Sequence, residues 1–298
     1  MNIFSAFSRP ASRHLGGGRT PLQTLGHILS QAAPATAARM AAWIWSSPPR
    51  PRGDSYAVPM GAKPLTATLS GKTAHGFFWP GQSVEAGQVL VQHGWGGSVA
   101  GIRAVIDALL PTGKSVVAFD AFAHGTSGWG RHGRRQSSLI ELSDLVLAID
   151  REHGPFDAVI AHSAGAPAVT RAFRQGMRVS KAVFLSPLVE PLAQAHLLSE
   201  ALGLSGQVAA RWPEMLLERF GATRQEIDMC PPPGSAPSLL IVHDRDDAFS
   251  PSTHSSRLRD EWSDAKMIET QGLGHYRIVN DPEVLARIGQ FLFSGGGA

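Results

Sequence analysis

The pattern of apolar and polar positions changes near residue 64. Beyond it, short apolar runs bounded by turn residues alternate with longer stretches that carry apolar residues at helical spacing. The strand-like runs are residues 65–69, 73–79, 89–92, 115–119, 158–161, 182–185 and 239–242. The helix-like stretches are residues 102–110, 139–150 and 166–174, with a last helix over 281–293. This alternation predicts an α/β fold with a mainly parallel sheet and helical crossovers.

The first two runs are separated only by Ser70, Gly71 and Lys72, a connection typical of a hairpin. The sheet is therefore expected to open with antiparallel strands and to be mixed. A chain of 298 residues is long enough to bury a full core, whether as one large domain or two small ones.

About fifty residues, 187–237, separate the sixth and seventh runs. They contain two amphipathic stretches, 192–202 and 208–220, which Gly203 and Gly221 are placed to terminate. We interpret this insertion as a small helical cap over the carboxyl edge of the sheet. An insertion that packs on the body and does not move as a lid would have the same pattern. Three residues of the second stretch are candidates for lining a pocket: Trp212, Met215 and Leu216.

The first 55 residues form a separate segment, followed by a core of residues 56–186 and 238–298. Residues 1–53 hold six Arg and no Asp or Glu. We expect residues 1–25 to be a flexible tail and residues 26–46 a helix that packs on the body or near the site entrance. An interfacial helix in contact with a membrane is the alternative, because tryptophans and Arg39 suit a lipid surface. The composition is also that of a mitochondrial transit peptide.

The net charge, the single cysteine and the lack of several known motifs exclude a number of protein classes. A net charge of +3 is too small to indicate a nucleic-acid partner. Cys230 is the single cysteine, so an intrachain disulfide is excluded and a reducing compartment is favoured. Neither a secretory signal nor an apolar run long enough to span a membrane occurs, which makes the cytoplasm the expected location. Metal-ligand spacings and phosphate-binding glycine loops are lacking, so no metal and no cofactor are expected.

Histidine, aspartate and serine residues, whose side chains can take part in catalysis, follow several of the predicted strands. Residues 93–97 read His-Gly-Trp-Gly-Gly, residues 120–128 begin with Asp and include His124, residues 162–165 read His-Ser-Ala-Gly, and residues 243–247 read His-Asp-Arg-Asp-Asp. The carboxyl ends of parallel strands share one edge of a sheet, which is where ligands bind in such folds. These four loops are therefore expected to converge.

Residues 161–165, Ala-His-Ser-Ala-Gly, resemble a nucleophile elbow, in which small residues two places on either side let a serine project above the sheet. A serine that merely caps a helix would be the alternative. Candidate partners follow in the order acid and then histidine. Asp244, Asp246 and Asp247 compete for the acid, and His275 comes 28 residues after Asp247.

Over residues 88–293 the chain resembles the α/β-hydrolase superfamily, and more narrowly bacterial hydrolases with this His-Gly-Trp-Gly-Gly loop, whose substrates are generally undefined. The resemblance implies an eight-stranded, mainly parallel sheet with helices on both faces and a helical cap. It implies Ser163 as nucleophile, His275 as general base and Asp247 as the acid, on its spacing to Pro251, with Asp246 as the alternative. The implied oxyanion hole consists of the backbone N–H groups of two residues, Trp95 and Ala164. His93, Asp120 and His124 would be structural.

The expected activity is hydrolysis of carboxylic esters through an acyl-enzyme on Ser163, with a small acyl compound as substrate and no nucleic-acid partner. Thioesterase, lactonase and other reactions of the same triad stay open, as does a non-catalytic ligand-binding protein. Serine at the elbow argues against dehalogenases and epoxide hydrolases, which have Asp there. The sequence leaves substrate, cap motion and oligomeric state undetermined.

Overall fold

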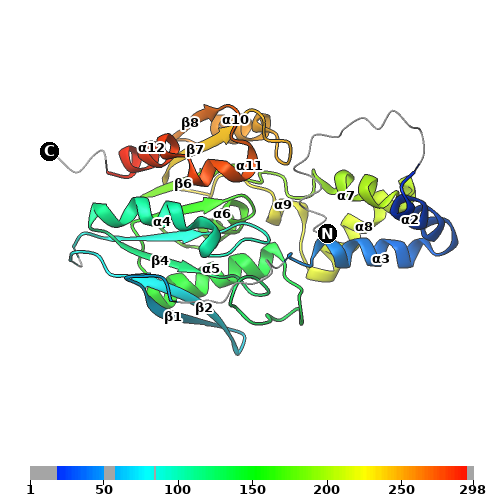
Figure 1. Ribbon diagram of the computed structural model, residues 1–298, viewed down its shortest axis with the longest axis horizontal. Helices are drawn as coiled ribbons and strands as arrows, with labels where there is room; N and C mark the ends of the chain where they lie inside the picture. Colours follow the sequence, from blue (N-terminus) through cyan, green and yellow to red (C-terminus); the bar gives the residue numbers. More distant parts are fainter. Residues whose placement is uncertain (1–18, 50–57, 84, 294–298) are drawn as a thin grey trace.

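The computed structural model describes residues 19–49, 58–83 and 85–293 (Figure 1). A single eight-stranded sheet runs through these residues in the order β1-β2-β4-β3-β5-β6-β7-β8. Strand β2 is antiparallel to both its neighbours, and the pairs from β4 to β8 are all parallel. The expected mainly parallel, eight-stranded sheet is confirmed.

The strands lie close to the predicted runs. They are β1 (Lys63–Leu69), β2 (Lys72–Trp79), β3 (Gln88–Gln92), β4 (Ser115–Phe119), β5 (Ala158–His162), β6 (Lys181–Leu185), β7 (Ser238–Asp244) and β8 (Ala265–Thr270). Strand β8 was not among the predicted runs. It is an edge strand whose residues are all exposed or only partly buried, so its sequence lacks the continuous apolar run that marks a buried parallel strand.

Helices cover both faces of the sheet. The helices of the body are α4 (Arg103–Leu109), α5 (Leu139–His153), α6 (Gly165–Arg174), α10 (Ser252–Glu261), α11 (Gly274–Arg277) and α12 (Pro282–Phe293). Apolar residues of α5, α6 and α10 pack in one core layer, and those of α4 and α12 pack in the other. The two layers bury the sheet between them, which holds the carboxyl ends of β3 to β7 as a rigid edge.

Three helices lie between β6 and β7: α7 (Ala195–Leu202), α8 (Gly206–Phe220) and α9 (Arg224–Ile227). Helices α7 and α8 end at Gly203 and Gly221, as predicted. Both glycines are left-handed, with φ of 65° and 61°, a conformation that a side chain would disfavour.

The N-terminal segment forms two helices, α2 (Pro21–Ala32) and α3 (Pro34–Trp45), and the expectation of one helix over residues 26–46 is wrong. The first helix starts early because Thr20, its N-cap, forms a capping box with Gln23, with Pro21 at the first helical position. It stops because Pro34 cannot continue it and suits the first turn of the next helix. The tail predicted for residues 1–25 falls largely on residues 1–18, outside the described part of the chain.

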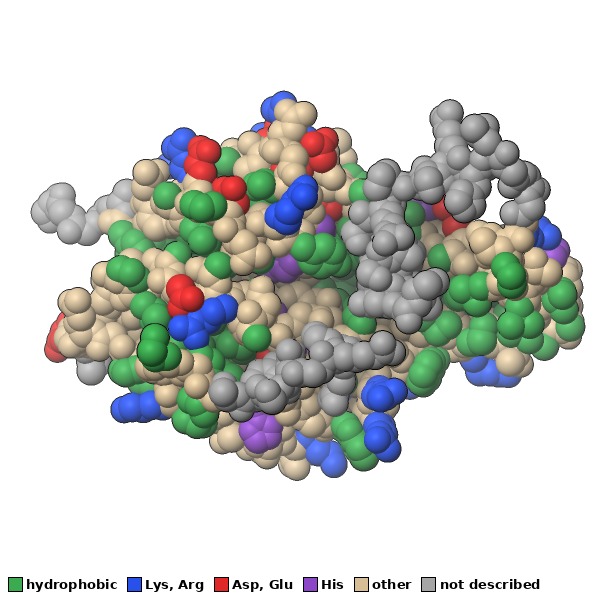
Figure 2. Space-filling view, viewed as in Figure 1, with side chains coloured by type: hydrophobic (Ala, Val, Ile, Leu, Met, Phe, Trp, Pro, Cys, Tyr) green, Lys and Arg blue, Asp and Glu red, His purple; other side chains and the backbone are tan. Residues whose placement is uncertain are grey.

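Helices α2 and α3 pack on α7 and α8, and the four helices form a lobe beside the body (Figure 1). Alanines of α3 share a buried cluster with apolar residues of α7 and α8. The face of the lobe seen in Figure 2 carries many hydrophobic side chains. Leu22, Leu25 and Ile28 of α2 are exposed. Among the described helices, none combines the length and the apolar character that crossing a bilayer requires. Peripheral membrane contact stays a prediction.

Candidate active site

Ser163 sits between β5 and α6 in a strained turn. Its φ is +52°, a left-handed conformation that costs free energy for a residue other than glycine. Small neighbours make the turn possible: a Cβ on Gly165 would lie 2.7 Å from the carbonyl oxygen of His93. The N-cap of α6 is Ala164, with no side-chain cap, so Ser163 does not cap the helix.

The structure brings Ser163, His275 and Asp247 together. His275 Nε2 lies 2.8 Å from Ser163 Oγ, and His275 Nδ1 lies 2.7 Å from Asp247 Oδ2. A carboxylate can only accept here, so Nδ1 carries a proton and Nε2 is left to accept the serine hydroxyl. All three residues are buried. The arrangement can therefore take the proton of Ser163 as its oxygen becomes a nucleophile.

The carboxylate of Asp247 is held from both sides. Its Oδ1 accepts the backbone N–H groups of Phe249 and Ser250, each at 2.9 Å. Burial alone would raise the pKa of this carboxyl, but hydrogen bonds from His243 and His275 outweigh burial and hold the pKa well below its usual range. Asp247 is therefore ionised and fixed beside the imidazole.

The two competing aspartates hold the loop that carries His275. Asp244 is fully buried and accepts from Thr270 Oγ1 at 2.7 Å and from the Leu273 N–H at 2.9 Å. Asp246 is exposed, and its Oδ2 accepts the Gly272 N–H at 3.0 Å. Neither carboxylate forms a hydrogen bond with the ring of His275, and both instead anchor the residues just before it.

Two further histidines, which the sequence did not single out as site residues, adjoin this group. His243 is buried, with Nδ1 2.7 Å from Ser255 Oγ and Nε2 within 3.2 Å of both Asp247 Oδ2 and the Ser250 carbonyl. His162 lies 2.9 Å through Nε2 from the carbonyl oxygen of His275. Burial, and then the neighbouring His275, lower the pKa of His162 to about 3. The signal was present in the sequence, since His162 is the last residue of β5 and His243 lies at the carboxyl end of β7, the edge where ligands bind in such sheets.

The expected oxyanion donors border the same pocket as Ser163. Neither the Trp95 nor the Ala164 backbone N–H donates a hydrogen bond to another described residue, so both are available to a ligand. The loop of Trp95 approaches closely because Gly94 has no side chain: a Cβ there would lie 2.8 Å from Ser163 Cβ.

The polar residues after β3 and β4 bind the loops to each other. His93 Nε2 accepts the Ala121 N–H at 3.0 Å, which leaves Nδ1 to donate to the Gly94 carbonyl at 2.7 Å. Burial lowers the pKa of His93. Asp120 accepts the N–H groups of Val99 and Thr126, and His124 Nδ1 lies 2.8 Å from the Phe122 carbonyl. These contacts favour the structural interpretation of His93, Asp120 and His124.

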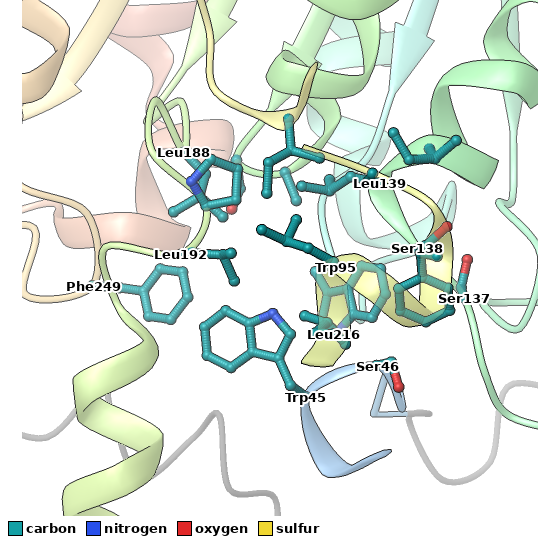
Figure 3. A pocket seen from close by; sticks show the side chains of 18 of the residues that line it. Trp45, Ser46, Trp95, Ser137, Ser138, Leu139, Leu188, Leu192, Leu216 and Phe249 are labelled. Atoms are coloured by element: carbon teal, nitrogen blue, oxygen red, sulfur yellow. The ribbon is translucent and has the colours of Figure 1, made fainter. Parts of the chain in front are cut away.

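A pocket of about 780 Å³, including its open mouth, lies over Ser163 (Figure 3). Its lining comes from α3, the start of α5, the segment between β6 and α7, helices α8, α9 and α11, and the loops at the sheet edge. Of the three candidate lining residues, Leu216 borders the pocket. Trp212 is instead fully buried, and its indole nitrogen donates to Ser199 Oγ at 2.9 Å. Met215 packs against the cluster between α3, α7 and α8.

The part of the chain that the structure describes brings no three His, Cys, Asp or Glu side chains into a group that could hold a metal ion.

Comparisons with known proteins bear on the fold. A family model described as the alpha/beta hydrolase fold matches residues 87–231. No curated protein sequence matches the chain. Among solved structures, an esterase of Pyrococcus furiosus is 20% identical, with 85% of this chain and 98% of that one covered and a TM-score of 0.60.

Two other solved structures are similar to the same extent. Est1E from Butyrivibrio proteoclasticus, with bound ferulic acid, is 17% identical over 76% of this chain and 96% of its own, with a TM-score of 0.57. A 2-hydroxy-6-oxo-6-phenylhexa-2,4-dienoate hydrolase from Rhodococcus is 15% identical over 78% and 99%, also with a TM-score of 0.57. Together with the order and direction of the strands, these likenesses show that the chain has the α/β-hydrolase fold.

Proposed function

We propose that the protein is a serine hydrolase that cleaves carboxylic esters through an acyl-enzyme on Ser163. The observation that carries the proposal is the hydrogen-bonded series Ser163–His275–Asp247, with 2.8 Å and 2.7 Å between the paired atoms, at the base of a pocket. A serine held in a strained turn and paired with an oriented imidazole is the arrangement that acyl transfer requires.

In the proposed reaction, Ser163 Oγ attacks the acyl carbon while His275 Nε2 takes the proton of the serine hydroxyl. The oxyanion accepts hydrogen bonds from the Trp95 and Ala164 N–H groups, each worth about 2.7–4 kcal/mol to the transition state. His275 then gives the proton to the leaving alcohol, and the ester bond breaks. Water, activated by the same imidazole, releases the acid and restores Ser163. Asp247 stabilises the imidazolium throughout.

The loop of residues 93–97 supports placing the protein with the bacterial hydrolases that share its His-Gly-Trp-Gly-Gly sequence. The fold neighbours include enzymes named as an esterase and as a hydrolase of a dienoate, so the fold alone does not select the bond that is cleaved. Thioesters and lactones would react through the same steps. A panel of simple esters, thioesters and lactones therefore separates these activities.

A fluorophosphonate probe tests the nucleophile directly, because it reacts only with an activated serine. We expect labelling of the wild type and none of Ser163→Ala. Ser83→Ala serves as the matched control, since Ser83 is exposed and does not line the pocket. Equal labelling of Ser163→Ala and wild type would overturn the assignment. Turnover of no member of the panel would favour a ligand-binding protein.

A further inference from the structure

The pocket over Ser163 is closed in part by the N-terminal segment. Trp45 and Ser46, at the end of α3, line it together with Leu216, Leu217 and Phe220 of α8. The ring of Trp45 lies 5.3 Å from that of Trp212, which is fully buried in the lobe. Packing against α8 therefore fixes the position of Trp45, so this side chain is part of the wall of the pocket.

The lining carries almost no charge. None of the described residues that line the pocket is Asp, Glu, Lys, Arg or His, and Tyr276 is the titratable one among them. Two of the serine hydroxyls donate within the protein: Ser46 to the Ala42 carbonyl at 2.8 Å, and Ser137 to Glu141 at 3.1 Å. A charged group on a bound acyl chain would lose its hydration there without gaining a partner.

The close-up view gives the pocket a direction (Figure 3). Phe249 lies on one side, and Ser46, Ser137 and Ser138 lie on the opposite side, with Trp45 and Leu216 between them. The Phe249 ring is 4.9 Å from that of His275, so its side is the side of the proposed triad. An acyl group joined to Ser163 would extend from there toward Trp45.

We propose that this pocket binds an uncharged, apolar acyl group, and that Trp45 of the N-terminal helix pair limits its length. The inference rests on the proposed function, because it concerns the acyl group that Ser163 receives. It joins α2 and α3 to the helices of residues 187–237 as one composite cap, and it makes Trp45 a specificity-determining residue.

The first test measures kcat/KM for nitrophenyl esters of increasing acyl length, from acetyl through butanoyl and octanoyl to dodecanoyl. We expect kcat/KM to rise about fourfold for each methylene group that enters the pocket and to fall once the chain passes Trp45. Trp45→Ala should move the maximum to longer chains. Trp43→Ala is the matched control: Trp43 is on the same helix, is half exposed and does not line the pocket. An unchanged profile in Trp45→Ala, or the same change in both variants, overturns the inference.

A second variant narrows the pocket rather than opening it. Ala222 lines the pocket and is only partly buried, so Ala222→Phe adds bulk to the pocket wall. We expect it to lower kcat/KM for the octanoyl ester at least about tenfold while the acetyl ester stays within a factor of about three. The test of charge compares butanoyl with monosuccinyl esters, and the charged ester should react at least about tenfold more slowly in the wild type. Equal rates for the two esters would contradict an uncharged pocket.

A binding measurement separates this inference from the proposed function. Octanamide is uncharged and offers no ester to cleave, and its binding to Ser163→Ala can be followed by tryptophan fluorescence. If the wild type cleaves none of the esters but octanamide binds, and Ala222→Phe weakens that binding, the proposed function fails and the pocket assignment stands. If esters are cleaved by Ser163 with a length profile that neither Trp45→Ala nor Ala222→Phe alters, the function stands and the pocket assignment fails.

Discussion

Nε2 of His243 lies 3.2 Å from Oδ2 of Asp247, the same carboxylate oxygen that accepts from Nδ1 of His275. The two imidazoles therefore hold one oxygen from two directions. Ser255 Oγ, 2.7 Å from Nδ1 of His243, can donate to that nitrogen and leave Nε2 protonated toward Asp247. We infer that His243 is a positioning residue, which acts on His275 of the proposed triad through the aspartate.

His243→Phe should lower kcat about tenfold and leave KM within a factor of about two. The reason is that a hydrogen bond to a charged group is worth about 1.5–3 kcal/mol, and here it fixes the acid rather than the substrate. Steady-state kinetics on an ester substrate measure both constants. His196→Phe is the control, because His196 is exposed in the lobe. A rise in KM as large as the fall in kcat would show a merely structural role. Activity that returns only when the variant is refolded would show the same.

The neighbouring aspartates should differ in their effect on catalysis. Asp247→Asn leaves His275 without its ionised partner and is expected to lower kcat by roughly 10⁴-fold, as the loss of the correct tautomer does in triads generally. Asp246→Asn removes only the charge of an exposed side chain, whose amide oxygen can still accept the Gly272 N–H, and should change kcat by less than about fivefold. Single-turnover rates of both variants check the order. The reverse order would assign the acid to Asp246.

The buried His162 predicts a loss of stability in acid. Its pKa is lowered from 6.5 to about 3 in the folded protein, so between these values the unfolded chain binds the proton and the folded chain does not. The free energy of unfolding therefore falls as the pH falls through this window, by up to about 1.4 kcal/mol per pH unit.

His162→Gln should reduce that slope, since glutamine carries no proton to exchange. Urea unfolding at several pH values between 6.5 and about 4 measures the slope in both proteins. His93 is buried with a lowered pKa as well, so part of the slope should persist in the variant. A slope that the substitution leaves untouched would mean that His162 is already protonated in the folded state.

The sequence predicted most of the sheet, and it named the three residues of the proposed triad that the structure brings together, because both depend on local signals. Buried strands show as apolar runs, and the serine turn shows as a spacing of small residues around Ser163. Strand β8 lacked this signal because its residues are exposed or only partly buried at the sheet edge. The break between α2 and α3 was also readable, since Pro34 marks it.

Other features depend on contacts between distant segments and could not be read along the chain. Trp45 reaches the pocket only because α3 packs on α8, more than 150 residues later in the sequence. His243 pairs with Asp247 and Ser255 through the course of one loop and the following helix. Trp212 was a candidate for lining the pocket, yet it is fully buried beneath Trp45 of α3. Which side chains of a helix point into the pocket is decided only when the helices pack together.

Gly94 lets the loop of Trp95 approach Ser163. In Gly94→Ala the new Cβ would lie 2.8 Å from Ser163 Cβ and 2.9 Å from the His162 carbonyl, so the loop must move and carry the Trp95 N–H with it. Losing one oxyanion donor is expected to lower kcat about 10²–10³-fold. Gly128→Ala is the control, because no atom lies within 4 Å of a Cβ there. Wild-type kcat in Gly94→Ala would remove Trp95 from the proposed oxyanion hole.

Gly26 joins the N-terminal helices to the rest of the lobe. A Cβ at this position would lie 1.8 Å from the carbonyl oxygen of Leu202, so Gly26→Ala must separate α2 from the end of α7. Helix α3 follows α2 after a single residue and carries Trp45 into the pocket, and a shift of α2 should therefore loosen the pocket wall. We expect kcat/KM for octanoyl esters to fall at least about fivefold, while acetyl esters, which need only the base of the pocket, change little. Gly206→Ala is the control, since its Cβ would meet no atom within 4 Å. Equal losses for both esters would instead mean that α2 supports the proposed triad itself.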